Sequence, residues 1–409
     1  MSGGEIIRAH WMDKPETRAV TAALGQAGCA LRFVGGCVRD TLLGRAFADI
    51  DIATDAAPNK VMDALRTAGL KAIPTGVGHG TVTAVAGSKY FQITTLRRDV
   101  ETDGRHATVA FTDDWEKDAA RRDLTINAIY LDTDGRVYDP YCGRADLAVG
   151  RVRFVGTAHN RIVEDVLRLL RYFRFYAHYG SPPPDTEALT ACESLAPQLP
   201  SLSGERVRAE LMKLLQAPDP RPSLRMMGEA GIFEHFLPEA TNLHVLERLV
   251  EIEGQTGTDI DPIRRLTALL AGGPIVLSHV AERLRLSNAE RDYFAIFAAE
   301  SVSPEQDALA RRHLLYRLGT TVYRGLVLLS WARADDDAGW RELLDLADSW
   351  SPKSLPLTGD DVLDRGIASG PAVGVILRSL ELWWIEGNFA ADRAECLERL
   401  SIEVTSDQA

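Results

Sequence analysis

Features of secreted, zinc-binding and membrane-spanning proteins are scarce in this chain. It has five cysteines among 409 residues and no pair spaced Cys-x-x-Cys, which argues against a disulfide framework and against a zinc site. No apolar run approaches the length of a membrane span, and the first residues lack the apolar core of a secretory signal. We therefore expect a cytoplasmic protein with reduced thiols that does not act at a membrane.

Internal repeats and low-complexity tracts are also lacking, as is typical of globular proteins. The 409 residues, 45% of them hydrophobic, suffice for more than one domain. The pattern is β-rich with helices up to about residue 150 and mainly helical afterwards. Breaks that contain proline at 182–184 and 217–222, and further breaks near 254–262 and 351–358, interrupt the helical portion.

These breaks predict an α+β protein with an N-terminal mixed β-sheet head followed by an all-helical remainder. We expect four parts, which are a head (1–150), a neck (151–217), a body (218–290) and a tail (291–409).

The first chemical signal is a glycine pair between a strand and a helix. The mostly apolar run 31–34 precedes Gly35 and Gly36, after which apolar residues recur at near-helical spacing up to Leu43. Glycines let backbone N–H groups approach phosphate oxygens, and the start of a helix favours negative charge. Arg39, one turn into the helix, can add a charge-assisted contact. Taken alone, the pair is equally compatible with an ordinary tight turn.

Two carboxylates follow the glycine pair. Asp49 and Asp51 are two apart in a predicted strand, so they project from one face, whereas Ile50 and Ile52 project from the other. Two like charges at this spacing favour a cation, and Mg²⁺ commonly binds one or two carboxylates together with substrate phosphates. An exposed strand edge is the simpler explanation of the pair alone, but its place after the glycine turn makes a phosphate and metal site the better interpretation.

A second polar cluster, residues 121–130 (RRDLTINAIY), ends in an alternation that favours a strand. Together with residues 35–40 (GGCVRD) and 49–51 (DID), it resembles the class II CCA-adding enzymes and bacterial poly(A) polymerases, within the polymerase-β-like nucleotidyltransferase superfamily. Residues 164–175 (EDVLRLLRYFRF) resemble the nucleotide-selecting helix of that family, and residues 357–374 resemble a segment of its C-terminal part.

The resemblance implies a nucleotidyltransferase head ahead of a helical neck, body and tail, and it implies roles for single residues. The two aspartates of residues 49–51 would bind Mg²⁺, and Gly36 and Arg39 would hold the nucleotide triphosphate. Arg122 and Asp123 would lie near the triphosphate and the ribose. Without the resemblance, such a basic pair beside an acid is usually a solvated surface cluster.

The resemblance also implies a base-reading function for the segment after residue 164. Asp165 and Arg168 are three apart on a predicted helix and would therefore be neighbours on one face, which Arg171 and Arg174 continue. Asp165 and Arg168 would serve as a template for the Watson–Crick edge of the incoming base, because a carboxylate only accepts hydrogen bonds and a guanidinium only donates them. Arg171 and Arg174 would support that geometry or contact the substrate. The alternative is a surface ion pair.

Two features bear on the reaction itself. The polar, turn-rich segment 98–107 predicts a mobile loop, and in the family such a loop is associated with the switch from adding C to adding A. His106 lies in that segment and is better explained as an exposed side chain than as a general base. Gln92 stands where many members of the family carry a glutamate, and because an amide cannot take up a proton, we leave the base unassigned.

These parts predict a template-independent tRNA nucleotidyltransferase that uses Mg²⁺ and adds C, C and A from CTP and ATP to the 3′ end of tRNA. Two alternatives stay open: a poly(A) polymerase of the same family and, because of Gln92, a catalytically silent RNA- or nucleotide-binding protein. The net charge of −12 is unfavourable for RNA binding. We therefore expect a local basic strip from the arginines at 151, 153, 161, 168, 171, 174, 206 and 208. Whether one chain adds both C and A, and its oligomeric state, stay open.

Overall fold

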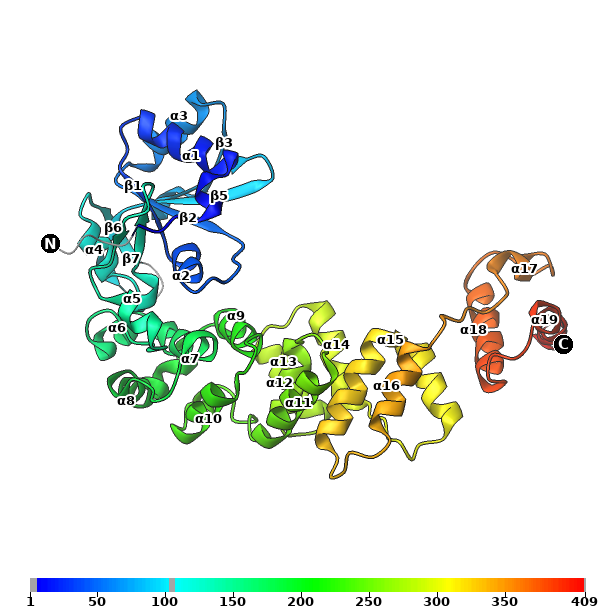
Figure 1. Ribbon diagram of the computed structural model, residues 1–409. Coiled ribbons are helices and arrows are strands. Elements are labelled where there is room, and N and C mark those ends of the chain that lie inside the picture. Colours follow the sequence, from blue (N-terminus) through cyan, green and yellow to red (C-terminus); the bar gives the residue numbers. More distant parts are fainter. Residues whose placement is uncertain (1–5, 103–106, 408–409) are drawn as a thin grey trace. The chain divides into compact units, whose positions relative to one another are not determined.

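The computed structural model describes residues 6–102 and 107–407 (Figure 1). Their contacts divide the chain into two compact units, one of residues 1–241 with 282–286 and one of residues 242–281 with 287–409. The predicted α+β class is confirmed, because a mixed sheet in the first unit is followed by helices. Within the described ranges, none of the helices combines the length and the hydropathy that a bilayer crossing requires.

A seven-stranded mixed sheet forms the head. Its spatial order is β3-β4-β5-β2-β1-β8-β9, in which β2 and β5 are parallel and the other neighbouring pairs are antiparallel. The strands are β1 (Leu31–Val34), β2 (Ile50–Thr54), β3 (Lys71–Gly76), β4 (Thr81–Ala86), β5 (Lys89–Thr95), β8 (Tyr130–Asp132) and β9 (Val137–Tyr138). A separate antiparallel pair consists of β6 (Arg97–Thr102) and β7 (Ala107–Phe111).

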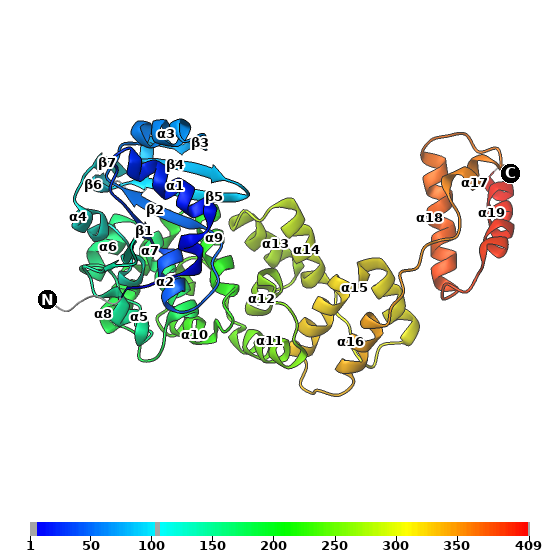
Figure 2. The ribbon, with the colours of Figure 1, turned by 45° about the horizontal axis from the view of Figure 1, so that its top comes forward.

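The two faces of the sheet have different coverings. Helices α1 (Pro15–Gln26) and α3 (Pro58–Thr67) pack over one face, as Figures 1 and 2 show, and both carry proline in the first turn, where its missing N–H is not needed. On the other face, Val34 and Ala53 form a buried cluster with Ala119 of α4 (Trp115–Ala120). Side chains alternate along a strand, so Asp51 projects from the same face as Ala53.

Helices fill most of the rest of the chain, and each of the four predicted breaks contains a junction between two helices, with those at 217–222 and 254–262 also including end residues of the adjoining helices. The remaining α-helices are α2 (Gly36–Leu42), α5 (Gly143–Ala148), α6 (Ala158–Glu164), α7 (Leu167–Tyr179), α8 (Thr186–Leu195), α9 (Gly204–Leu215), α10 (Arg221–Glu229), α11 (Leu243–Thr256), α12 (Pro262–Leu269), α13 (Pro274–Arg283), α14 (Asn288–Ala299), α15 (Ala308–Arg333), α16 (Trp340–Asp348), α17 (Gly359–Leu363), α18 (Pro371–Glu386) and α19 (Arg393–Asp407). Short 3₁₀ helices are η1 (His10–Asp13), η2 (Val77–His79), η3 (Thr125–Asn127), η4 (Ala196–Ser201) and η5 (Phe233–His235).

The last three helices, α17 to α19, enclose an apolar core that draws its buried residues from after position 350. Its buried members are Leu357, Val362, Ile376, Leu380, Trp384, Cys396, Leu400 and Val404. Each of the three helices is amphipathic and buries only one side. The core therefore consists of the apolar side chains on these buried sides.

Two local predictions were wrong. The strand expected across residues 125–130 begins only at Tyr130, because residues 125–127 form η3. The polar side chains of that alternation turn inward rather than to water: the Thr125 hydroxyl donates to Asp146 Oδ2 at 2.7 Å, and Asn127 is buried. The loop expected at 98–107 is largely the strand pair β6 and β7, and residues 103–106, His106 among them, lie outside the described residues.

Candidate active site

The glycine pair forms the predicted turn between β1 and α2. Gly35 has φ 74° and ψ −131°, a conformation in the region that favours glycine, and Gly36 is the first residue of α2. A β-carbon at Gly35 would lie 3.7 Å from Asp51 Oδ2 and 4.0 Å from Arg122 Nη1. The turn therefore lies next to Asp51, one of the two predicted metal ligands, and next to Arg122.

Asp49 and Asp51 lie at the start of β2, on the strand next to the glycine turn. Asp49 is exposed just before the strand, and Asp51 is partly buried within it. Burial raises the pKa of Asp51, nearby Arg122 lowers it, and the charge of Asp49 raises it again, so that the net shift is upward. Burial thus outweighs the two arginines near Asp51, Arg122 and Arg39, and a cation bound there would offset it.

The position that many family members fill with glutamate lies beside Asp51. Gln92 of β5 is the direct register partner of Asp51 in the parallel pair β2–β5, and its side chain is exposed. Among the described residues, no group of three or more acidic, histidine or cysteine side chains is arranged to hold a metal. The oxygen ligands available at this point are therefore the two carboxylates and the amide of Gln92.

Arg122 is held in place by a buried acid that the sequence argument did not single out. Asp118 of α4 accepts hydrogen bonds from Arg122 Nη2 at 3.2 Å and from the Tyr130 hydroxyl at 2.7 Å, and Arg122 Nε donates to that hydroxyl at 3.0 Å. Burial raises the pKa of Asp118, but Arg122 and Arg121 outweigh it and bring the pKa to about 2. The charged carboxylate fixes the guanidinium near Asp51. The four-residue spacing from Asp118 to Arg122 is a signal that could have suggested this pair.

Asp123 connects the head with α7. Its Oδ2 accepts from Arg171 Nε at 2.7 Å, and its Oδ1 accepts from Asn127 Nδ2 at 3.0 Å and from the Leu124 backbone N–H at 2.8 Å. Burial raises the pKa of Asp123, whereas Arg171 and these hydrogen bonds lower it to about 2. Asp123 and Arg171, expected near the nucleotide for separate reasons, are thus brought together as an ion pair in which Asp123 is buried and Arg171 is partly exposed.

Arg39 is also engaged within the protein. Its Nη1 donates to Asn127 Oδ1 at 2.6 Å, its Nε and Nη2 donate to Asp40 at 3.2 and 3.0 Å, and Nη2 donates to the Tyr179 hydroxyl at 2.7 Å. The side chain is buried beside the aromatic ring of Tyr179, with Cζ 4.2 Å from the ring centroid. Arg39 therefore ties α2 to η3 and to the end of α7.

Asp165 and Arg168 do not share a helix, which corrects the prediction that they are neighbours on one face. Helix α6 ends at Glu164 and α7 begins at Leu167, and Asp165 between them is extended, with φ −155° and ψ 106°. Asp165 accepts two hydrogen bonds from Arg206 Nη2, at 3.0 and 2.8 Å. The spacing of apolar residues did not reveal the break between α6 and α7, because the apolar pattern continues through it.

Arg168 has different partners from Asp165. It donates to Glu164 Oε2 at 2.5 Å and to the Arg161 carbonyl at 3.0 Å. Further along α7, Arg174 forms an ion pair with Glu210 of α9, a buried acid that also lies 3.6 Å from Arg171. Glu210, Arg206 and Tyr179 are far in sequence from the residues that they contact, so no spacing rule could have predicted these pairs.

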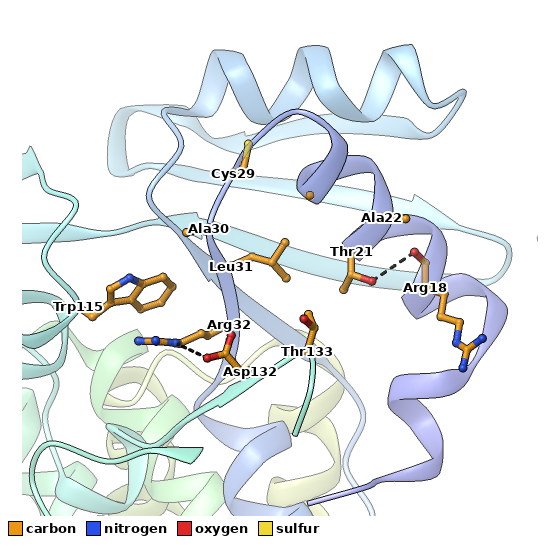
Figure 3. Close-up of a pocket in the computed structure, with 11 residues that line it drawn as sticks. Arg18, Thr21, Ala22, Cys29, Ala30, Leu31, Arg32, Trp115, Asp132 and Thr133 are labelled. Atoms are coloured by element: carbon orange, nitrogen blue, oxygen red, sulfur yellow. Dashed lines mark hydrogen bonds and ion pairs between the residues drawn. The ribbon is translucent and has the colours of Figure 1, made fainter. Parts of the chain in front are cut away.

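A cleft of about 580 Å³ opens elsewhere on the head, at the beginning of β1 (Figure 3). Arg32 lies there beneath Trp115, with its Cζ 4.4 Å from the ring centroid, and its Nε donates to Asp132 at 3.2 Å. None of the residues that line this cleft is one of the predicted site residues.

Comparisons with known proteins agree with this arrangement. The family model for the poly A polymerase head domain matches residues 31–153. The family model for the probable RNA and SrmB-binding site of polymerase A matches residues 184–243. The mitochondrial CCA tRNA nucleotidyltransferase 1 of Danio rerio is 35% identical over 387 residues, which cover 91% of this chain and 87% of the relative. The chain belongs to the CCA tRNA nucleotidyltransferase family. A bacterial member, the CCA-adding enzyme of Latilactobacillus sakei, is 30% identical and covers 90% of this chain and 92% of the relative.

Solved structures of family members have the same fold. The CCA-adding enzyme of Bacillus stearothermophilus in complex with CTP superposes with a TM-score of 0.70 at 27% identity, over 97% of this chain and 99% of that one. The Thermotoga maritima enzyme complexed with tRNA has a TM-score of 0.62 at 20% identity, which shows the shared fold. Nucleotidyltransferases of this kind generally use a divalent metal. The prediction of a CCA-adding or poly(A) polymerase family member is confirmed.

Proposed function

We propose that this protein adds C, C and A, from CTP and ATP, to the 3′ end of tRNA without a nucleic-acid template. The observation that carries the proposal is the pair of carboxylates, Asp49 and Asp51, beside the glycine turn and near Arg122, in a chain of this family. The relatives named above are CCA-adding enzymes or CCA tRNA nucleotidyltransferases, and of the two solved structures one contains CTP and the other tRNA.

We assign Mg²⁺ to the two carboxylates at the start of β2, Asp49 and Asp51. The upward shift of the Asp51 pKa supports this assignment, because burial and the charge of Asp49 outweigh Arg122 and Arg39, and a bound cation would offset that cost of ionising Asp51. When bound there, Mg²⁺ would neutralise charge on the triphosphate and lower the pKa of the attacking hydroxyl. Gln92 accepts and donates hydrogen bonds but takes up no proton, so it can orient a neighbouring group without acting as the base.

The triphosphate would lie along the turn formed by Gly35 and Gly36, with Arg39 and Arg122 nearby as cations. Backbone N–H groups at the turn and the fixed guanidinium of Arg122 would hold the phosphates in one orientation. The tRNA 3′ hydroxyl then attacks the α-phosphate in line, a new phosphodiester bond forms, and pyrophosphate leaves. Arg122 keeps its charge throughout because Asp118 and Tyr130 bind it on its other side.

Base selection would take place at the break between α6 and α7. Asp165 offers carboxylate oxygens and Arg168 offers guanidinium N–H groups, which together can read complementary parts of a base edge. Both side chains are paired within the protein, Asp165 with Arg206 and Arg168 with Glu164. A base at this point would exchange those hydrogen bonds for its own. Arg171 and Arg174, both tied to Glu210, would keep α7 in place.

The four-part division extends this proposal to the whole chain. Residues 1–150 would be the catalytic head and residues 151–217 the base-reading neck, with residues 218–290 as the body. Residues 291–409 would be a tail that contacts tRNA. We place the protein in the cytoplasm, although the vertebrate relatives are named as mitochondrial.

Extension of a tRNA that lacks its terminal C-C-A tests the function directly. With Mg²⁺ and CTP alone we expect two added nucleotides, and with CTP and ATP three, after which addition stops. A long A tract on generic RNA would instead identify a poly(A) polymerase. Nucleotide binding without any extension would identify a silent binder, as Gln92 allows. A chain that adds C but never A would overturn the assignment of both activities to one chain.

A further inference from the structure

Tyr179, the last residue of α7, contacts the side chain that we expect to hold the triphosphate. Its hydroxyl accepts a hydrogen bond from Arg39 Nη2 at 2.7 Å and donates one to Asp40 Oδ1 at 2.9 Å. The guanidinium of Arg39 also stacks on the ring, with Cζ 4.2 Å from its centroid. One side chain of α7 thus contacts the Arg39 guanidinium through both its hydroxyl and its ring.

The same end of α7 is tied to the chain after α2 by a second contact. Arg45 Nη1 donates to the His178 carbonyl at 2.8 Å, and Arg45 Cζ lies 5.1 Å from the centroid of the Tyr179 ring. One hundred and forty positions separate Arg39 from Tyr179. This long-range contact joins α2, which follows the glycine turn, to α7, which follows the break proposed to read the base. It therefore sets the spacing between the place proposed for the triphosphate and the place proposed for the base.

We propose that Tyr179 is a positioning residue for nucleotide binding, whose hydroxyl holds Arg39 of α2 in place against the end of α7. The proposal rests on the proposed function, in which Arg39 contacts the triphosphate. Asn127 and Asp40 bind other N–H groups of Arg39, so the loss of the Tyr179 hydroxyl leaves the side chain in the site but removes one of its constraints. Phosphate binding then has to restrict a more mobile guanidinium, which weakens it.

The test is the dissociation constant of CTP with Mg²⁺ and without tRNA, measured for the full-length protein. We expect Tyr179→Phe to raise it about three- to tenfold, less than the loss of a whole hydrogen bond to a charged group produces, because Asn127 and Asp40 still hold Arg39. In an Arg39→Met background, the same substitution should change the constant less than about twofold, because the group through which Tyr179 acts is gone. Tyr176→Phe, which removes a hydroxyl one turn earlier on α7, is the matched control and should leave CTP binding unchanged.

Each outcome has a distinct meaning. A wild-type protein that does not extend tRNA contradicts the proposed function, whatever Tyr179 does. If wild type adds C-C-A but Tyr179→Phe binds CTP like wild type, the positioning role is wrong. It is equally wrong if Tyr179→Phe weakens binding by the same factor in both backgrounds, since that is a general loss of structure, or if Arg39→Met leaves CTP binding unchanged. Thermal unfolding of each variant shows whether the fold is retained.

Discussion

At the scale of single residues, charge pairing decides which acids are available for chemistry. Asp118 and Asp123 are buried, but each meets arginines that hold its pKa down to about 2. The pKa of Asp51 is raised, because its burial and the like charge of Asp49 outweigh Arg122, which also pairs with Asp118, and Arg39. The contrast separates acids that hold the protein together from the acid that is left for a cation.

The carboxylate pair yields the most direct prediction. Asp49→Ala and Asp51→Ala should each lower the rate of nucleotide transfer by about a thousandfold or more, because the cation loses a ligand that holds it against the phosphates. The fold should be retained, since burial already disfavours the charge of Asp51. Single-turnover extension of tRNA measures the rate, and circular dichroism and thermal unfolding measure the fold.

A control separates this effect from a general change of charge. Asp63 lies on α3, with a side chain 75% exposed, and Asp63→Ala removes one negative charge away from the site. It should leave the transfer rate unchanged. Rates close to wild type for Asp49→Ala or Asp51→Ala would show that the metal assignment is wrong.

Asp118 yields a prediction about pH. Its pKa falls from a usual value near 3.8 to about 2 in the folded protein, so its contribution to the free energy of unfolding is fully present above about pH 4 and is lost as the pH falls toward 2. Between pH 6 and pH 3 the free energy of unfolding of the wild type should fall by about 1 kcal/mol because of this group. In Asp118→Asn this contribution to the fall should be absent. Urea unfolding of both proteins at several pH values measures the difference. Parallel pH profiles would contradict the assignment.

At the scale of elements, strands and helix breaks could be predicted where local chemistry decides them. The turn between β1 and α2 follows from Gly35, and the break before α8 follows from the prolines at 182–184. Residues 125–127 could not be predicted, because inward hydrogen bonds to Asp146 and Asp123 replace the solvent contacts that an alternating strand implies. The break at Asp165 depends on Arg206, forty-one positions away, and spacing does not report such partners.

The joint between α6 and α7 makes base selection testable. Arg168→Ala removes the donor that pairs with Glu164 and with the Arg161 carbonyl, and it should lower the preference for CTP over UTP more than it lowers triphosphate binding. Loss of one charge-assisted hydrogen bond to a base predicts a change of about tenfold in that preference. Competition between CTP and UTP during addition measures it, and inhibition by inorganic tripolyphosphate measures triphosphate binding.

Arg151→Ala is the matched control, because Arg151 belongs to the same set of arginines and its side chain is 56% exposed. It should change neither quantity. A loss of thermal stability in Arg168→Ala without any change in nucleotide preference would mean that Arg168 forms only a structural ion pair with Glu164.

At the scale of the whole molecule, the arginines expected to form a basic strip are largely matched by acids. Arg153 pairs with Asp146, Arg171 with Asp123, and Arg206 with Asp165. These acids reduce the positive charge that the arginines could offer to RNA, in keeping with the net charge of −12. The basic strip stays a prediction. Partial neutralisation favours release of a finished product, because nonspecific attraction to phosphates is what would retain it.

The division of labour along the chain can be tested through the core of α17 to α19. Leu380 is fully buried in that core, so Leu380→Ala should destabilise these helices by about 2 to 5 kcal/mol. If the tail contacts tRNA, the dissociation constant of tRNA should rise while that of CTP, for which we propose a site outside the tail, stays unchanged. Filter binding and equilibrium titration measure the two constants, and hydrogen exchange reports whether the tail helices have opened. An opened tail with unchanged tRNA affinity would assign the tRNA contacts to other parts of the chain.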